Sequence, residues 1–233
     1  GGKNFHFADD TYSDEESLNY LAEQTVQSAF GYSGQKCSAC SILYIPEENL
    51  ERFVPILKRQ ITKFMSTQRN YGLINSRAYT RVSEIIDSLK KDKEMDIIVN
   101  PVCDKDVSYL VTPLVFSCTN HDSYVFSKEF FAPILAIYPY KNEEFKNTIS
   151  LATDSNNYAL TGAFFSKDSA NVRKVSRLMK HKAGNFYINC KSTGSVVGNQ
   201  PFGGSGKSGT NDKAGDVNLL FRLFNQRNIK IKH

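Results

Sequence analysis

The segment GQKCSAC at residues 34–40 holds the side chains best suited to covalent chemistry, the thiols of Cys37 and Cys40. A cysteine in a glycine-bearing turn between a helix and a strand can present its sulfur to a cleft. The thiolate is the nucleophilic form, and nearby cations or backbone N–H groups favour it. Lys36 is adjacent, although neighbouring side chains in an extended turn often point apart. Cys37 is therefore a candidate nucleophile.

The Cys37-x-x-Cys40 spacing has three other interpretations. It could be half of a zinc site, but such a site needs four ligands, and the sequence has no second CxxC and no HxxxH pair, so no metal is expected. It could be a redox dithiol, although that motif usually opens a helix in a thioredoxin-like unit. It could also be two ordinary buried cysteines, which composition alone favours. The residues by themselves leave these interpretations open.

A second segment, KEFFAP at residues 128–133, places an acid before two aromatic rings and a proline. The carboxylate of Glu129 could accept hydrogen bonds from ligand hydroxyls, and a phenyl ring could pack against a planar group. The alternative is an ordinary turn into a buried strand, because most such acids are solvated.

A third segment is rich in glycine and serine, with Thr193-Gly194-Ser195 followed by PFGGSGKSG at residues 201–209. It is not a phosphate-binding P-loop, because Pro201 stands where GxxxxGK[ST] requires glycine. The dinucleotide fingerprint GxGxxG after a strand is also missing. Its backbone N–H groups and hydroxyls are suited to holding a carboxylate. A flexible surface loop is the alternative.

The apolar pattern predicts the elements that must position these segments. Helices are predicted over 18–29, 50–64, 82–89, 143–153 and 172–180, and strands over 42–45, 97–99, 110–116, 134–138, 160–165 and 186–189. Ser13 and Glu16 form a capping box ahead of the first helix, and Pro55 should kink the second or mark its beginning. The alternation predicts an α/β fold with a mostly parallel sheet flanked by helices. The stretch 192–209 is predicted to be a long, functional or disordered loop.

Composition limits the class of protein. The chain has 233 residues, of which 40% are hydrophobic and 23% charged, with a net charge of +5, so it can build a sizeable core and is not a disordered chain. The best apolar stretch, 130–140, is broken by two prolines, so no membrane span is expected. The charge could attract an anionic substrate or cofactor, but without a dense basic block no nucleic-acid partner is expected.

Taken together, the segments resemble the aldehyde dehydrogenase superfamily. GQxC combined with EFF(G/A)P is typical of the superfamily, and GGKNFHF at residues 1–7 fits the same pattern. NFYINCKSTGSVVGNQPFGG at residues 185–204 and SGTND at 208–212 are similar to the branch that acts on glutamate γ-semialdehyde. These segments occur in family order and cover the chain from end to end.

The resemblance implies an NAD-dependent oxidation of L-glutamate γ-semialdehyde to L-glutamate in proline catabolism. Cys37 would be the nucleophile, acting through a hemithioacetal and a thioester, with its backbone N–H as an oxyanion donor. Glu129 would bind the hydroxyls of the nicotinamide ribose, and Phe131 would lie beside that ribose. Cys40 has no assigned role and is expected to be structural.

The resemblance also assigns the substrate-binding residues. Gly194 and Ser195 would hold the α-carboxylate of the substrate, with Ser38 also in reach, and Phe202 would pack on its aliphatic part. Ala132 stands where the family usually has glycine, and it should fit if its φ is below zero.

At the level of domains, the resemblance predicts that residues 1–233 are the nucleophile-bearing catalytic domain, without the N-terminal NAD-binding domain and the general base. The segment 205–233 is expected to pack toward a cofactor domain or a partner subunit. The chain alone should be inactive, and the full-length protein should be a homo-oligomer, a dimer or larger. Its expected location is the mitochondrial matrix in a eukaryote and the cytoplasm in a bacterium.

Three alternatives remain open at this point. They are another semialdehyde dehydrogenase, a thiol-redox module that uses Cys37 and Cys40, and a non-catalytic interaction fragment.

Overall fold

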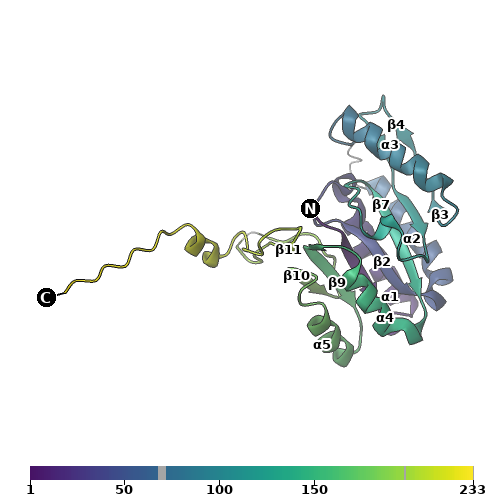
Figure 1. The fold of residues 1–233 in the computed structure, drawn as a ribbon. Helices are drawn as coiled ribbons and strands as arrows, with labels where there is room; N and C mark the ends of the chain where they lie inside the picture. Colours follow the sequence, from purple (N-terminus) through teal and green to yellow (C-terminus); the bar gives the residue numbers. More distant parts are fainter. Residues whose placement is uncertain (68–71, 197, 233) are drawn as a thin grey trace.

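Seven strands form the central sheet of the computed structural model, in the order β10-β9-β1-β2-β7-β6-β3 (Figure 1). The structure describes residues 1–67, 72–196 and 198–232. The strands are β1 (Asn4–Ala8), β2 (Cys40–Pro46), β3 (Asp96–Val99), β6 (Leu114–Ser117), β7 (Ile134–Tyr140), β9 (Thr161–Phe165) and β10 (Asn185–Ile188). All neighbours pair in parallel except β3 and β6, which are antiparallel.

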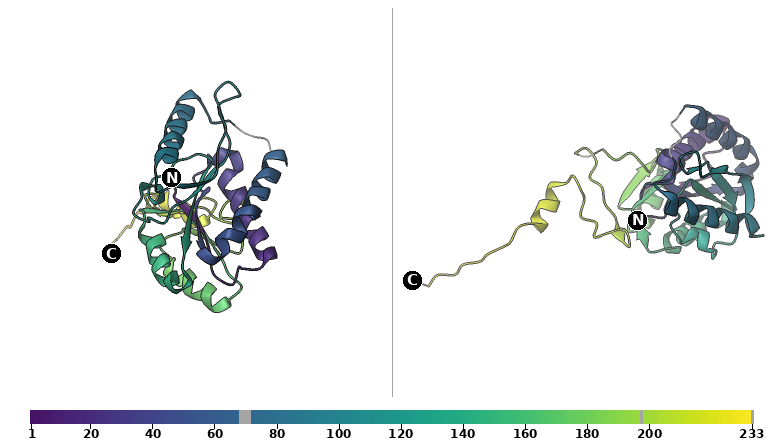
Figure 2. Two further views of the ribbon diagram at one scale, coloured as in Figure 1. Left: turned by 90° about the vertical axis from the view of Figure 1, so that its right-hand side faces the viewer. Right: turned by 90° about the horizontal axis from the view of Figure 1, so that it is seen from above.

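Helices cover both faces of this sheet (Figure 2). The α-helices within the described residues are α1 (Glu15–Phe30), α2 (Glu47–Thr67), α3 (Ser76–Lys91), α4 (Phe145–Asp154) and α5 (Ser169–Leu178). One apolar core lies between the sheet and α1 and α2, and a second core lies between the opposite face and α3, α4 and α5. Parallel strands joined by helices require this arrangement, because the connections bury both faces. The predicted α/β fold with a mostly parallel sheet flanked by helices is confirmed.

The strand β1 was not predicted from the sequence, although it lies in the middle of the sheet. All five of its residues are buried, including the polar Asn4 and His6. Those two side chains interrupt the apolar run, and they are accommodated because each has buried hydrogen-bond partners. Most buried polar groups in proteins are hydrogen-bonded in this way.

Two other predictions from the sequence need correction. The strand predicted over 110–116 is divided at Thr112-Pro113 into β5 (Leu110–Val111) and β6, and β5 pairs instead with β4 (Cys103–Asp104) in a separate small sheet. Of the two alternatives for Pro55, the one in which it begins a helix is wrong, because α2 already starts at Glu47 and contains Pro55, while a kink stays a prediction.

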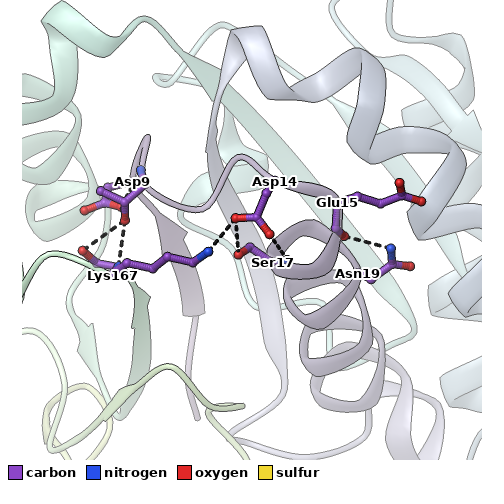
Figure 3. A network of polar contacts seen from close by, with 8 residues as sticks. Asp9, Asp14, Glu15, Ser17, Asn19 and Lys167 are labelled. Atoms are coloured by element: carbon purple, nitrogen blue, oxygen red, sulfur yellow. Dashed lines mark hydrogen bonds and ion pairs between the residues drawn. The ribbon is translucent and has the colours of Figure 1, made fainter.

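The N-cap of α1 also differs from the prediction. Asp14, not Ser13, is the N-cap residue, and its carboxylate accepts hydrogen bonds from the backbone N–H and the hydroxyl of Ser17 (Figure 3). The ammonium group of Lys167 pairs with the same carboxylate. An aspartate in this position accepts hydrogen bonds from free N–H groups of the first turn, and its negative charge interacts favourably with the helix dipole.

The parallel strands all begin at the same end of the sheet. We call this end the amino edge, because the N-terminal residue of each parallel strand lies there. Asn4, Cys40, Ile134, Thr161 and Asn185 each open a strand there, so the segments that precede these residues meet at this edge. The register between β1 and β2 shifts between Asn4 and Phe5, where β2 contains one residue more than β1. Bulges of this kind turn side chains at the rim of a sheet and are common beside functional sites.

After β10 the chain contains few regular elements. The pairing of β11 (Ser205–Gly206) with β8 (Tyr158–Ala159) attaches residues 202–214 to the body, and a bridge between Phe202 and Ala214 closes that segment on itself. Beyond them, residues 217–232 extend away from the sheet (Figure 1), with Leu220, Phe221 and Phe224 exposed. Among the helices in the described ranges, none combines the length and apolar content that crossing a membrane would take.

Candidate active site

The turn that carries Cys37 is fixed through its backbone carbonyls. The side-chain amide of Asn4 donates to the carbonyl oxygens of Cys37, at 2.7 Å, and of Ala39, at 2.9 Å. The hydroxyl of Thr161 donates to the carbonyl of Ser38 at 3.3 Å. Asn4 also accepts from the backbone N–H of Thr161, so β1 and β9 hold the turn together. Cys37 itself is half-buried.

Two glycines allow other backbone segments to approach this turn closely. A Cβ on Gly2 would lie 2.3 Å from the carbonyl oxygen of Cys37, and a Cβ on Gly34 would lie 2.2 Å from that of Ala132. Gly34 also has a φ of +67°, which favours glycine independently of the space. The beginning of β1 and the KEFFAP segment therefore pack directly against the segment 34–37.

Glu129 and Phe131 lie at the same edge, just before β7, which is the neighbour of β2 in the sheet. The backbone N–H of Gly2 donates to Oε1 of Glu129 at 2.9 Å and orients the carboxylate. Phe131 has a φ of +51° and its side chain is 43% exposed. A left-handed backbone at a bulky residue is strained, and such strain is often found at functional sites. Ala132 is not left-handed, so it fits the place of the usual glycine, as predicted.

The Gly- and Ser-rich loop begins after β10, at the end of the sheet opposite the amino edge, and then runs back along α1. Asn189, just after β10, accepts at its carbonyl from the Tyr20 hydroxyl. Lys191 donates from its backbone N–H to Gln24, and the hydroxyl of Ser192 lies 3.1 Å from that of Ser28. The contacts thus advance along α1 toward its C-terminal end, which faces the amino edge. This course leads Gly194 and Ser195 toward the side of the molecule that carries Cys37.

A shared partner connects this loop to the cysteine turn. The Ser28 hydroxyl, which contacts Ser192, also accepts from the backbone N–H of Cys40 at 3.3 Å. Burial lowers the pKa of Lys36, and the positive charge of Lys191 on the loop lowers it further. The Nζ of Lys36 lies 4.8 Å from the centre of the Tyr32 ring, so this ammonium group makes a cation–π contact with an aromatic side chain.

Phe202 is positioned by contacts on both sides. The amide of Asn185 donates to the carbonyl of Pro201 and accepts from the backbone N–H of Gly203. Phe202 itself pairs with Ala214 through two backbone hydrogen bonds of 3.0 and 2.8 Å. Ser195 donates to the carbonyl of Gln200 at 2.6 Å, which closes the loop between them. That Gly194, Ser195 and Phe202 face Cys37 across one pocket stays a prediction, and residue 197 of this loop lies outside the described residues.

Cys40 differs sharply from Cys37. It is 1% exposed, its Sγ lies 3.3 Å from the carbonyl oxygen of Ile42, and burial raises the pKa of its thiol to about 12. Both cysteines are free thiols. Within the described ranges, no cluster of three His, Cys, Asp or Glu side chains is arranged to hold a metal ion. These features agree with a structural role for Cys40.

Three residues of β1 and its approach were missed by the sequence analysis. Asn4 and His6 hold neighbouring segments, and Lys3 is 2% exposed with its Nζ 4.4 Å from the centre of the Phe130 ring. Burial lowers the pKa of Lys3 to about 7, against opposing effects of Glu129 and Cys40. The alternation of polar residues with Phe5 and Phe7 was the signal that could have identified this strand.

Comparison with known proteins gives consistent results. The aldehyde dehydrogenase family model matches residues 1–227. The mitochondrial delta-1-pyrroline-5-carboxylate dehydrogenases of Bos taurus and Homo sapiens are 38% and 35% identical to this chain over 240 residues, covering 100% of it and 42% of each relative. The chain thus spans about two fifths of the length of these relatives.

Solved structures resemble the fold over almost the same range. The delta-pyrroline-5-carboxylate dehydrogenase of Mycobacterium tuberculosis aligns with a TM-score of 0.83 and 33% identity over 94% of this chain and 41% of its own. The 1-pyrroline-5-carboxylate dehydrogenase from Thermus with bound NAD aligns with a TM-score of 0.81 and 29% identity over 96% of this chain and 42% of its own. Since the family model covers the cysteine turn, the KEFFAP segment and the loop that follows β10, the chain belongs to the aldehyde dehydrogenase family.

Proposed function

We propose that this chain is the nucleophile-bearing catalytic portion of a 1-pyrroline-5-carboxylate dehydrogenase, an NAD-dependent oxidoreductase that converts L-glutamate γ-semialdehyde to L-glutamate in proline catabolism. The observation that carries the proposal is the fixed turn at the amino edge, where Asn4 and Thr161 hold the backbone around a half-buried Cys37. The printed names of the relatives support the choice of substrate.

In the proposed reaction the Cys37 thiolate adds to the aldehyde carbon, forms a C–S bond and gives a hemithioacetal, whose oxygen accepts from the backbone N–H of Cys37. NAD, when bound, supplies the hydride acceptor. The oxyanion of this adduct re-forms a C=O bond as the hydride leaves the carbon, which leaves a thioester on Cys37. Water then replaces sulfur at the acyl carbon, which releases the carboxylic acid and the free thiol. A general base for that water belongs to a part of the protein outside this chain.

The residues at the amino edge fit a ribose of NAD. The backbone of Gly1 and Gly2 lies against the Glu129 carboxylate, because a Cβ on Gly1 would be 2.3 Å from Oε2. The Gly2 N–H occupies one lone pair of Oε1, and a carboxylate has further acceptor sites for hydroxyl groups. The exposed ring of Phe131 beside it offers a flat apolar surface. Glu129 would therefore accept from ribose hydroxyls while Phe131 packs on the sugar.

We assign the substrate to the loop after β10. Gly194 and Ser195 would hold the α-carboxylate, Ser38 would assist from the cysteine turn, and Phe202 would pack on the methylene groups. The exposed apolar side chains of 217–232 support the proposal that the C-terminal segment packs on a cofactor domain or a partner subunit of a homo-oligomer. For a eukaryotic source we propose the mitochondrial matrix, as the names of the eukaryotic relatives indicate, and for a bacterial source the cytoplasm.

The first test is reduction of NAD by the whole protein that carries this chain, with glutamate γ-semialdehyde as substrate. Cys37→Ala and Cys37→Ser should abolish turnover, while Cys40→Ser should keep most of it. The reverse pattern would overturn the nucleophile assignment. A reversible Cys37–Cys40 disulfide seen by intact mass, together with turnover that survives Cys37→Ala, would favour the thiol-redox alternative.

A second test concerns the substrate. Replacing Gly194 or Ser195 with a bulky apolar residue should reduce kcat/KM for glutamate γ-semialdehyde more than for a simple aldehyde such as propanal. An equal reduction for both substrates would argue for another aldehyde as the natural substrate.

A further inference from the structure

His6 occupies a fully buried position on β1, between the two segments that the proposed function brings together. Its Nε2 accepts from the backbone N–H of Ser192 at 3.2 Å, and the hydroxyl of Ser192 lies at 3.2 Å from the same nitrogen. Its Nδ1 lies 2.9 Å from the hydroxyl of Thr25 on α1. The imidazole therefore contacts the loop on one side and α1 on the other.

The direction of each hydrogen bond follows from two backbone groups that can only donate. Because the Ser192 N–H points at Nε2, that nitrogen carries no proton, and Nδ1 carries the proton and donates to Thr25. The Ser192 hydroxyl then donates to Nε2 and accepts from the Ser28 hydroxyl, and Ser28 in turn accepts from the Cys40 N–H. A single chain of hydrogen bonds thus runs from the residue at the start of β2 to His6.

This chain connects the two halves of the proposed site. Cys40 lies three residues after the nucleophile, and Ser192 lies two and three residues before Gly194 and Ser195. The imidazole is 0% exposed, and burial lowers its pKa to about 3, so it remains neutral and keeps its acceptor at physiological pH. Buried networks in which every donor has an acceptor fix the position of the segments they join.

We propose that His6 is a positioning residue that sets the distance between the carboxylate-binding loop and the cysteine turn, and thereby selects aldehydes that carry a carboxylate. This inference rests on the proposed function. His6 touches neither substrate nor cofactor, and it acts through Ser192 and Ser28. The positioning role requires a hydrogen-bond acceptor at the position of Nε2, because without it the Ser192 N–H would be buried without a partner.

Two substitutions separate this role from simple packing. In His6→Gln, the side-chain oxygen can reach the position of Nε2, whereas in His6→Asn the shorter amide reaches only the position of Nδ1. We expect His6→Asn to raise KM for glutamate γ-semialdehyde about tenfold, with kcat/KM for propanal reduced less than about threefold. His6→Gln should stay within about threefold of the wild type for both substrates.

Thr148→Val in the whole protein serves as the matched control, because it removes a hydrogen bond from a buried hydroxyl on α4 to the carbonyl of Glu144, the N-cap residue of that helix. It should leave both KM values unchanged. Amide hydrogen exchange at Ser192 and Cys40, measured in the same variants, should be faster in His6→Asn than in Thr148→Val and close to the wild type in His6→Gln.

Equal losses for both aldehydes, or equal effects of the Gln and Asn variants, would overturn the inference. If the wild-type protein does not oxidise glutamate γ-semialdehyde at all, the proposed function fails, and the exchange rates alone then decide whether His6 positions the loop. Unchanged exchange at Ser192 in His6→Asn would reject that positioning role.

Discussion

At the scale of single residues, the polar side chains of β1 and its approach determine how the site is held. Lys3, Asn4 and His6 are consecutive or nearly so, yet each contacts a different segment. Asn4 and His6 are stabilised by buried hydrogen bonds, whereas the Nζ of Lys3 is buried with no hydrogen-bond partner among the described residues. Among these three residues, it is therefore the buried ammonium group of Lys3 that lowers the stability of the folded state.

The buried ammonium of Lys3 predicts a specific pH dependence of stability. Its folded-state pKa of about 7 lies below the ordinary lysine value of 10.5. Below pH 7 both states are protonated and the full cost of burying the charge is present. As the pH rises from about 7 to 10.5, the folded state is neutral while the unfolded state still binds a proton, so the cost declines. We expect Lys3→Met to be more stable than the wild type at pH 6, by on the order of 2–4 kcal/mol.

Chemical denaturation of both proteins at pH 6 and pH 10 measures this difference. The advantage of Lys3→Met should shrink toward zero at the higher pH. An advantage that is constant with pH would show that the ammonium is neutralised by a partner in the folded state.

Asn4 should matter for both stability and reactivity. Asn4→Ala removes three hydrogen bonds, to Cys37, Ala39 and Thr161, and leaves buried backbone groups unpaired. We expect a loss of about 2–4 kcal/mol in the free energy of unfolding. Asn4→Asp should cost more, because it turns a carboxylate oxygen toward two carbonyls.

The rate of Cys37 alkylation by iodoacetamide, measured under native conditions, reports on the turn itself. Thr161→Val, which removes only the side-chain bond to Ser38, is the control and should change this rate less than Asn4→Ala. The same rate in Asn4→Ala as in the wild type would show that the turn keeps its shape without Asn4.

At the scale of elements, the sequence predicts what local spacing determines and misses what distant partners determine. The apolar periodicity of α1, α3 and α5 identifies them, since each buries one face against the sheet. The strand β1 pairs with β2 and with the distant β9, where Phe5 lies opposite Gly162, so its alternating pattern could indicate a strand but not that its polar residues are buried as well. Among the proposed site residues, Cys37 and Glu129 are predicted by residue type and motif, whereas Asn4 and His6 act through partners that only the fold brings near.

The N-cap of α1 gives a test at this scale. Asp14→Ala should lower Tm, because it removes the acceptor for Ser17 and the partner of Lys167, while Ser13→Ala should leave Tm unchanged. The Lys167 and Ser17 contacts hold the pKa of Asp14 well below its ordinary value. The difference between the two variants should therefore be present at neutral pH and decline in strong acid. Thermal unfolding followed by circular dichroism measures it, and a larger loss in Ser13→Ala would restore the capping box.

At the scale of the whole molecule, the fold places the cysteine turn and the KEFFAP segment at the amino edge of the sheet, where we propose that the nucleophile and the cofactor-binding residues lie. The exposed apolar side chains of 217–232 support our proposal that this segment packs on a cofactor domain or a partner subunit. The apolar pattern of residues 217–232 does not identify the surface on which they pack, because periodicity shows only that a face is apolar.

We therefore expect the isolated 233 residues to reduce little or no NAD with glutamate γ-semialdehyde, since hydride transfer needs a positioned nicotinamide and hydrolysis of the thioester needs a base. NADH absorbance over time, with the whole protein as the positive control, measures this. Robust turnover by the isolated chain would contradict the assignment of these groups to another domain.

The place of β1 in the sheet has one more consequence. Among the described strands, β9 and β10 join β2, β7, β6 and β3 only through β1, so the two parts of the proposed site are carried on opposite sides of one short strand. A partial opening at that seam would separate the loop from the cysteine while each side kept its own helices. Turnover should then be lost at a lower temperature, or in less urea, than the helical circular dichroism signal. The residues of β1 would thus determine the temperature up to which the enzyme stays active.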